Sequence, residues 1–171
     1  CQTINGLLLS SLSRDHAHSF IKLGRLLERA DMATRMIDVG VGDIAERSDR
    51  FRAMDPLLWG ALLQGLSAAS AYRREVGPIV DRHAVVNFVF LAPAFPRSVK
   101  FCIRDMRNEL GKLNGSEEAL KVVGRIWRLL QRLNKQEMTQ AELHIFIDEF
   151  QVQLNNLHEA IEDAWFRVDR Q

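Results

Sequence analysis

Residues 13–39 constrain the fold of this chain most, because their apolar side chains recur at the spacing of an α-helix. One broad apolar stripe consists of Phe20, Leu23, Leu27, Ala30, Ala33 and Ile37. A second stripe, on the far side, consists of Ile21, Met32 and Met36. Arg25 and Arg29 lie within that second stripe, and a helix that is apolar on two sides is usually packed on two sides. We therefore predict one long helix in which both arginines are at least partly buried and are paired with Glu28 or Asp31.

Glycine, proline and capping residues divide the first half of the chain. Gly40 and Gly42 are predicted to end the first helix. Asp55 and Pro56 then begin a second long helix, since a capping carboxylate and a proline in the first turn both favour a helix start. We predict that this helix runs to about Glu75.

Residues 85–91 form a short and very apolar segment that periodicity alone cannot assign to a helix or a buried strand. Asp81 can cap a helix at this point, and the chain contains no other segment typical of a partner strand. We predict a helix, and a strand is the alternative.

Three further helices are predicted after residue 95. Their boundaries are an opening proline, a terminating glycine, a serine cap and a capping box: Pro96, Gly115, Ser116, and Thr139 with Glu142. The last helix can reach Arg167. The predicted fold is therefore all-α, a single domain over residues 1–171 built as a bundle of six or seven mostly antiparallel helices. Its predicted core includes Trp59, Phe88, Phe90 and Trp127.

Charge, hydropathy and cysteine content exclude several classes of protein. The 23 basic and 22 acidic residues nearly cancel, so no global field favours nucleic acid or an anionic membrane surface. No apolar run approaches the roughly 20 residues of a membrane-spanning helix. Cys1 and Cys102 are too few for a disulfide framework or a thiolate metal site, which fits a reducing compartment. We expect a soluble, cytoplasmic protein.

The beginning of the chain indicates a piece of a longer polypeptide. It starts at Cys1 without a methionine, yet Ile4, Leu7 and Leu8 already follow helical spacing. We expect residues 4–9 either to pack back on the bundle or to form an exposed apolar patch that drives dimerisation.

Catalytic and metal-binding motifs are scarce. No glycine-rich phosphate loop, nucleophile elbow or zinc-protease signature occurs. His16 and His18 diverge on a helix, which disfavours a metal clamp. Two pairs share a helix face without a third and fourth ligand: His144 with Asp148, and His158 with Glu162. We expect neither a metal nor a cofactor.

Two groups of charged residues admit more than one interpretation. A strip at helical spacing, which we interpret as a solvated face rather than an anion-binding surface, consists of Arg97, Lys100, Arg104 and Arg107. The other group consists of Arg25, Glu28, Arg29 and Arg35. We favour a buried ion-pair network that fixes helix register. The alternative is a pocket in which an arginine fork presents paired donors to a carboxylate or a phosphate.

The sequence LGRLLERADMATRMIDV closely resembles the signature of the α-E domain family, helical bacterial proteins named for a glutamate and arginine pair, here Glu28 and Arg29. The segment around Trp59 resembles the family's second helix. Residues 85–103 resemble its apolar helix, proline turn and following helix, and this segment adds Arg97 and Ser98 to the candidate binding residues. The resemblance covers residues 13–113. Where the family tends to place an acidic residue after the apolar helix, this chain has Ala92, so no acid role is assigned to that turn.

The resemblance implies that this chain is the second, C-terminal of two related helical halves, and that partner proteins carry out the chemistry. Proteins of this kind are encoded with, or fused to, circularly permuted ATP-grasp ligases and transglutaminase-like proteases, which suggests a role in peptide or amide-bond synthesis. Our first hypothesis is a non-catalytic helical accessory or interaction domain that docks against such a partner or against its own upstream half. The second is an enzyme or substrate-binding domain in which Glu28 acts beside Arg25 and Arg29 on an anionic or peptide substrate. The sequence leaves open whether the protein is an enzyme.

Overall fold

The fold consists of α-helices throughout the part of the chain that is described. The computed structural model describes residues 2–45, 55–133 and 138–167, and these residues form eight helices and no strand. The all-α prediction is confirmed, including the helical assignment of residues 85–91. The predicted number of six or seven helices is too low, because one predicted helix is divided in two and the first residues form a helix of their own.

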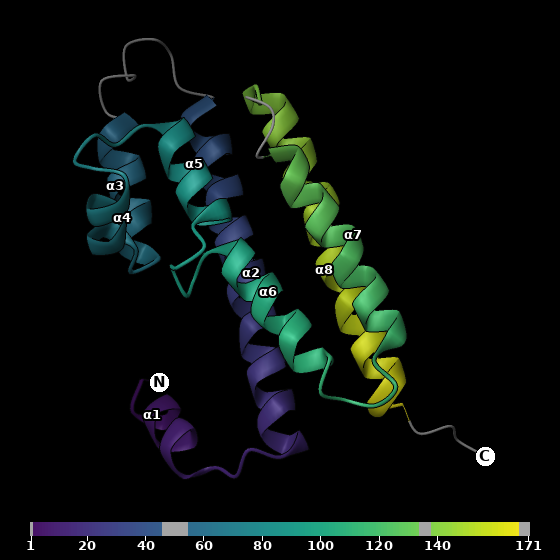
Figure 1. Ribbon diagram of the computed structural model, residues 1–171. Coiled ribbons are helices and arrows are strands. Elements are labelled where there is room, and N and C mark those ends of the chain that lie inside the picture. The colour runs from purple at the N-terminus through teal and green to yellow at the C-terminus, as the bar shows by residue number, and fades with distance from the viewer. Residues whose placement is uncertain (1, 46–54, 134–137, 168–171) are drawn as a thin grey trace.

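Four helices form a bundle in which neighbours run antiparallel (Figure 1). In order around the bundle they are α2 (His16–Ala45), α6 (Val99–Leu110), α7 (Glu117–Leu133) and α8 (Gln140–Trp165), and α8 closes the bundle against α2. Each buries one face at helical spacing. On α2 this face includes Leu23, Ala30, Ala33 and Ile37, as the broad stripe predicts. The second stripe is only partly covered, since Met36 is half-buried while Ile21 and Met32 are exposed.

Three shorter helices lie in the connection between α2 and α6, beside the C-terminal end of α2 (Figure 1). They are α3 (Asp55–Gly65), α4 (Ala69–Glu75) and α5 (Arg82–Leu91). As predicted, Trp59, Phe88 and Phe90 are buried, whereas Trp127 on α7 is only half-buried. Asp81 caps α5, because its Oδ1 accepts a hydrogen bond of 2.9 Å from the Ala84 N–H.

Gly40 and Gly42 do not end α2, which continues to Ala45. Gly40 is explained by packing, since a Cβ added there would lie 2.8 Å from Leu62 Cδ1 and 3.4 Å from the ring of Trp59. A glycine inside a helix costs about 1 kcal/mol relative to alanine, which the contact between α2 and α3 can offset. The prediction was wrong here because a glycine that permits close packing looks the same in sequence as one that ends a helix.

The predicted helix from Asp55 to about Glu75 is divided into α3 and α4. Ser67 lies between them with a φ of 54°, in the left-handed region that ends a right-handed helix. The N–H groups of Ser67 and Ala68 donate to the carbonyls of Gln64 and Leu63, so the break keeps its hydrogen bonds.

Three other predicted boundaries are displaced. The helix α6 begins at Val99 rather than at Pro96, because Ser98 caps it: its Oγ accepts a hydrogen bond of 3.1 Å from the Phe101 N–H. The same helix ends at Leu110, and Gly115 lies in the loop that follows, with a φ of 83°. The capping box of Thr139 and Glu142 is confirmed at the start of α8, which ends at Trp165, two residues before the predicted Arg167.

The first helix, α1 (Gln2–Ser11), lies to one side of the beginning of α2 (Figure 1). Its Ile4 and Leu7 side chains are 62% and 61% exposed, which corresponds to the exposed branch of our expectation for residues 4–9. Cys1 falls outside the described residues. None of the helices in residues 2–45, 55–133 and 138–167 is both long and apolar enough to cross a bilayer.

Candidate functional site

Glu28 and Arg29 are consecutive residues of α2, but they face different neighbours. Successive side chains on an α-helix are about 100° apart around its axis. Glu28 is exposed and lines a groove between α2 and α8. Arg29 is half-buried on the side of α2 that faces α6, where its charge acts on the buried thiol of Cys102. The two motif residues therefore serve two separate surfaces.

Arg25 and Arg29 stand one turn apart on the α6 side of α2, and both are half-buried, as predicted. Burial lowers the pKa of Arg25, and the nearby charge of Arg29 lowers it further. Neither guanidinium forms a hydrogen bond or an ion pair with another described residue. The predicted pairing with Glu28 or Asp31 is therefore wrong. Asp31 instead accepts a hydrogen bond of 2.8 Å from Arg35 Nε, on an exposed part of the helix.

A buried ion pair does exist in the bundle, at a position that the sequence analysis missed. Glu109 of α6 is 1% exposed. Its Oε1 accepts hydrogen bonds of 2.6 Å from Lys22 Nζ and 2.9 Å from Lys112 Nζ, and Ser19 Oγ donates to its Oε2. Burial raises the pKa of Glu109, but the hydrogen bonds and charges of the two lysines outweigh it, so the pKa is lowered overall. The available signal was its spacing, since Glu109 follows Cys102 and Met106 on the apolar face of the helix.

The groove between α2 and α8 has a volume of about 390 Å³ and a mixed lining. Its polar side chains come from both helices: Glu28, Asp31, Arg35, Gln151, Asn155 and His158. Leu27 and Leu154 supply apolar surface beside them. A concave site with a few polar groups over apolar surface is the usual form of a small-molecule site, so this groove is the strongest candidate binding site that contains Glu28.

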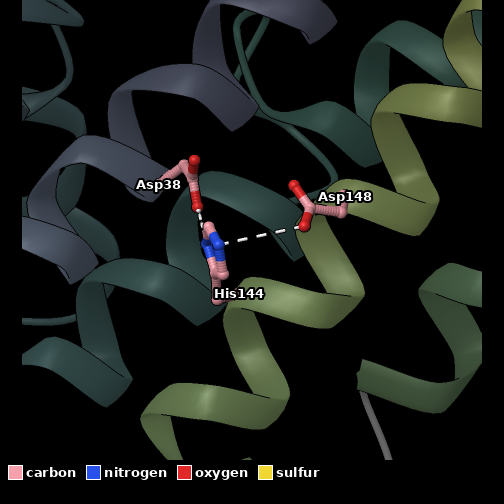
Figure 2. A group of neighbouring side chains, drawn as sticks. All are labelled: Asp38, His144 and Asp148. Atoms are coloured by element: carbon pink, nitrogen blue, oxygen red, sulfur yellow. Dashed lines mark hydrogen bonds and ion pairs between the residues drawn. The ribbon is translucent and has the colours of Figure 1, made fainter.

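Further along the same two helices, His144 lies between two carboxylates (Figure 2). Its Nδ1 is 2.6 Å from Oδ1 of Asp38 on α2, and its Nε2 is 3.8 Å from Oδ2 of Asp148. The hydrogen bond and charge of Asp38 raise the pKa of His144, and the charge of Asp148 raises it further. Each ring nitrogen faces a different carboxylate, so the arrangement suits a charged imidazolium between two acids better than three ligands converging on one metal ion.

Arg97 and Ser98, which the resemblance added as candidates, have structural contacts. Arg97 Nη1 donates to the Leu66 carbonyl over 3.1 Å, and the buried Ser98 Oγ donates to the Ala92 carbonyl over 2.5 Å. In the same strip, Arg104 binds Asp105 and covers the ring of Phe101. These contacts support a structural role for Arg97, Ser98 and Arg104 rather than a role in anion binding.

Cys102, on α6 beside Arg29, is a residue type that can act as a nucleophile. It is buried, and burial raises the pKa of its thiol to about 12, although the charge of Arg29 acts in the opposite direction. A thiol with so high a pKa is not a nucleophile near neutral pH.

Comparison with known protein families shows to which family the chain belongs. A family model described as a predicted alpha-helical domain with a conserved ER motif matches residues 1–166. The chain belongs to the Alpha-E family. The resemblance found in residues 13–113 is thereby confirmed and extends over the last two helices as well. No curated protein and no solved structure matches the chain.

Glu-Arg dipeptides occur twice in this Alpha-E chain, at 28–29 and at 46–47. The second lies outside the described residues. The first is the pair on which the resemblance rests, and its two side chains face the groove and α6, respectively.

Proposed function

We propose that this Alpha-E chain is a non-catalytic helical accessory domain that docks on an ATP-grasp-type ligase active in peptide or amide-bond synthesis. The observation that carries the proposal is the pair of half-buried arginines, Arg25 and Arg29, for which residues 2–45, 55–133 and 138–167 supply no acidic partner. Burial and the charge of Arg29 lower the pKa of Arg25, and two neighbouring cations of this kind favour contact with an acid from another molecule. An acidic segment of the ligase would provide that charge.

The reactive side chains support an accessory role. Cys102 is buried with a raised pKa, and the groove that Glu28 lines includes neither Arg25 nor Arg29. A mechanism in which Glu28 acts as acid or base beside both arginines would need them to converge on one substrate. The enzyme hypothesis is therefore less well supported than a role in binding.

A second protein-binding surface is provided by α1. This helix has no charged residue, and Ile4 and Leu7 are exposed on it. Apolar side chains in such a position are stabilised when another protein covers them. The partner would be the ligase, a transglutaminase-like protein or the upstream half of the same polypeptide, and sedimentation of the chain alone distinguishes these from a homodimer.

The proposal is tested by titrating the chain with its ATP-grasp-type ligase and measuring the dissociation constant at two salt concentrations. The double variant Arg25→Gln/Arg29→Gln should abolish binding and should melt no lower than the parent, because two neutral side chains remove the repulsion between the arginines. The matched control is Arg128→Gln, an exposed arginine on α7. Undiminished binding by the double variant, or failure of the parent chain to bind, would contradict the proposal.

A further inference from the structure

The side of α2 away from Arg25 and Arg29 carries a second feature that ligase docking leaves unexplained. Glu28 opens into the groove between α2 and α8 and forms no hydrogen bond or ion pair with any described residue. The other acid of the groove, Asp31, is already bound to Arg35. Glu28 is therefore the uncompensated charge in this groove, and the groove as a whole favours a cation.

Gly24 adds open space to the same groove. It lies in the interior of the thirty-residue helix α2, where glycine is unfavourable by about 1 kcal/mol relative to alanine. A Cβ added to Gly24 would meet no atom within 4 Å, so packing within the chain does not require a glycine. Its backbone lines the groove, and the missing side chain leaves open space one turn before Glu28. The glycine thus keeps clear a volume that no residue of the chain fills.

The rest of the groove indicates what can occupy that space. Leu27 and Leu154 offer apolar contact, and Gln151 and Asn155 offer amide groups from α8. Asn155 uses one amide hydrogen to bind Glu159 Oε1 over 2.9 Å, which leaves its carbonyl oxygen for another donor. The volume of about 390 Å³ suits a small molecule.

We propose that the groove between α2 and α8 binds a small ligand through a primary ammonium group, with Glu28 as its counter-ion. The ammonium donates to the carboxylate, an aliphatic group of the ligand packs on Leu27 and Leu154, and the amides of Gln151 and Asn155 bind its polar remainder. The site lies on a different side of α2 from the arginine pair, so it does not depend on ligase docking.

The probe for this site is L-leucinamide, which combines a primary ammonium, an isobutyl group and an amide. We would titrate the whole chain with it and follow backbone amide resonances by NMR. The expected shifts are confined to residues of the groove on α2 and α8. N-acetyl-L-leucinamide has no ammonium and should cause none.

Two pairs of variants test the roles of charge and space. Glu28→Gln should weaken binding of leucinamide by about tenfold or more, whereas Glu117→Gln, an exposed glutamate on α7, should not. Gly24→Leu should block binding without lowering the melting temperature, because leucine favours a helix and the position is open. The matched control is Gly42→Leu, which makes the same change at another open position of α2 and should bind like the parent.

The proposal is overturned if leucinamide causes no shifts at millimolar concentration, or if its acetylated form binds equally well. Binding that survives Glu28→Gln or Gly24→Leu unchanged would overturn it as well. None of these results would bear on the docking of the ligase, which is measured with the arginine variants.

Discussion

Lys22 Nζ lies 2.6 Å from Oε1 of Glu109, and this contact joins α2 to α6 at a carboxylate whose side chain is only 2% exposed. Lys22 and Lys112 are partly exposed, so water solvates both lysines while the carboxylate between them is enclosed by protein. This buried ion pair joins α2 to α6, and the motif residues Glu28 and Arg29 do not contribute to it.

Glu109→Gln should destabilise the chain by about 1–2 kcal/mol, because it removes the buried charge that two lysines and Ser19 bind. The loss is smaller than for a fully buried pair, since both lysines can turn to solvent. It corresponds to a fall in melting temperature of about 2–8 °C. Glu118→Gln is the matched control, because Glu118 pairs with Lys121 at the same spacing of three residues but is exposed. Equal melting temperatures of the two variants would contradict this account.

The contribution of Glu109 should depend on pH in one direction. Its pKa is lowered in the folded state, so the ionised form stabilises the fold at neutral pH, and this stabilisation is lost as the pH falls through the folded-state pKa. The difference in free energy of unfolding between the parent and Glu109→Gln should therefore be constant near pH 7 and shrink below about pH 4. Urea unfolding at a series of pH values measures it, and a difference that grows on acidification would have the wrong sign.

His144 should titrate above its ordinary pKa of about 6.5, because Asp38 and Asp148 favour the imidazolium. The stabilisation it gives is present below that ordinary value and is lost as the pH rises through the raised pKa. An NMR titration of the imidazole measures the midpoint. Asp38→Asn should lower it more than Asp148→Asn, since Asp38 forms the closer contact, at 2.6 Å. A midpoint at or below the ordinary value in the parent would show that the contact with Asp38 does not form in solution.

Two glycines of α2 should respond differently to alanine. A Cβ at Gly42 meets nothing within 4 Å, so Gly42→Ala should stabilise the chain by about 0.5–1 kcal/mol through helix propensity. Gly40→Ala should stabilise it less or not at all, because Leu62 must move away from the new methyl group. Thermal unfolding of both variants is sufficient to rank them. Equal stabilisation would indicate that α2 and α3 pack less closely than described.

Helical periodicity and capping residues predicted the all-α class, the buried stripe of α2 and the caps at Asp81 and Thr139, because these depend on local sequence. The break at Ser67 was not predicted, since serine seldom adopts a positive φ and nothing in its neighbours marks one. Nor could local sequence show that Glu109 meets Lys22, because that contact joins residues 87 positions apart.

In the candidate site, too, local sequence predicted some features, and contacts between distant residues determine the others. The motif identified Glu28 and Arg29 as residues of interest, and spacing predicted that Arg25 and Arg29 are partly buried. What surrounds them depends on α6 and α8, which are distant in sequence. The contribution of α8 to the groove, Gln151, Asn155 and His158, follows only from the packing of α8 against α2.

The central claim is that Glu28 and Arg29 act on separate surfaces and do not form a pair. A double-mutant cycle on the free energy of unfolding with Glu28→Gln, Arg29→Gln and the double variant tests it most directly. The same cycle with Lys22→Met and Glu109→Gln is the positive control, since those residues are 2.6 Å apart. The account predicts a coupling energy within about 0.5 kcal/mol for Glu28 and Arg29 and a larger one for the control. A coupling above about 1 kcal/mol between Glu28 and Arg29 would contradict it.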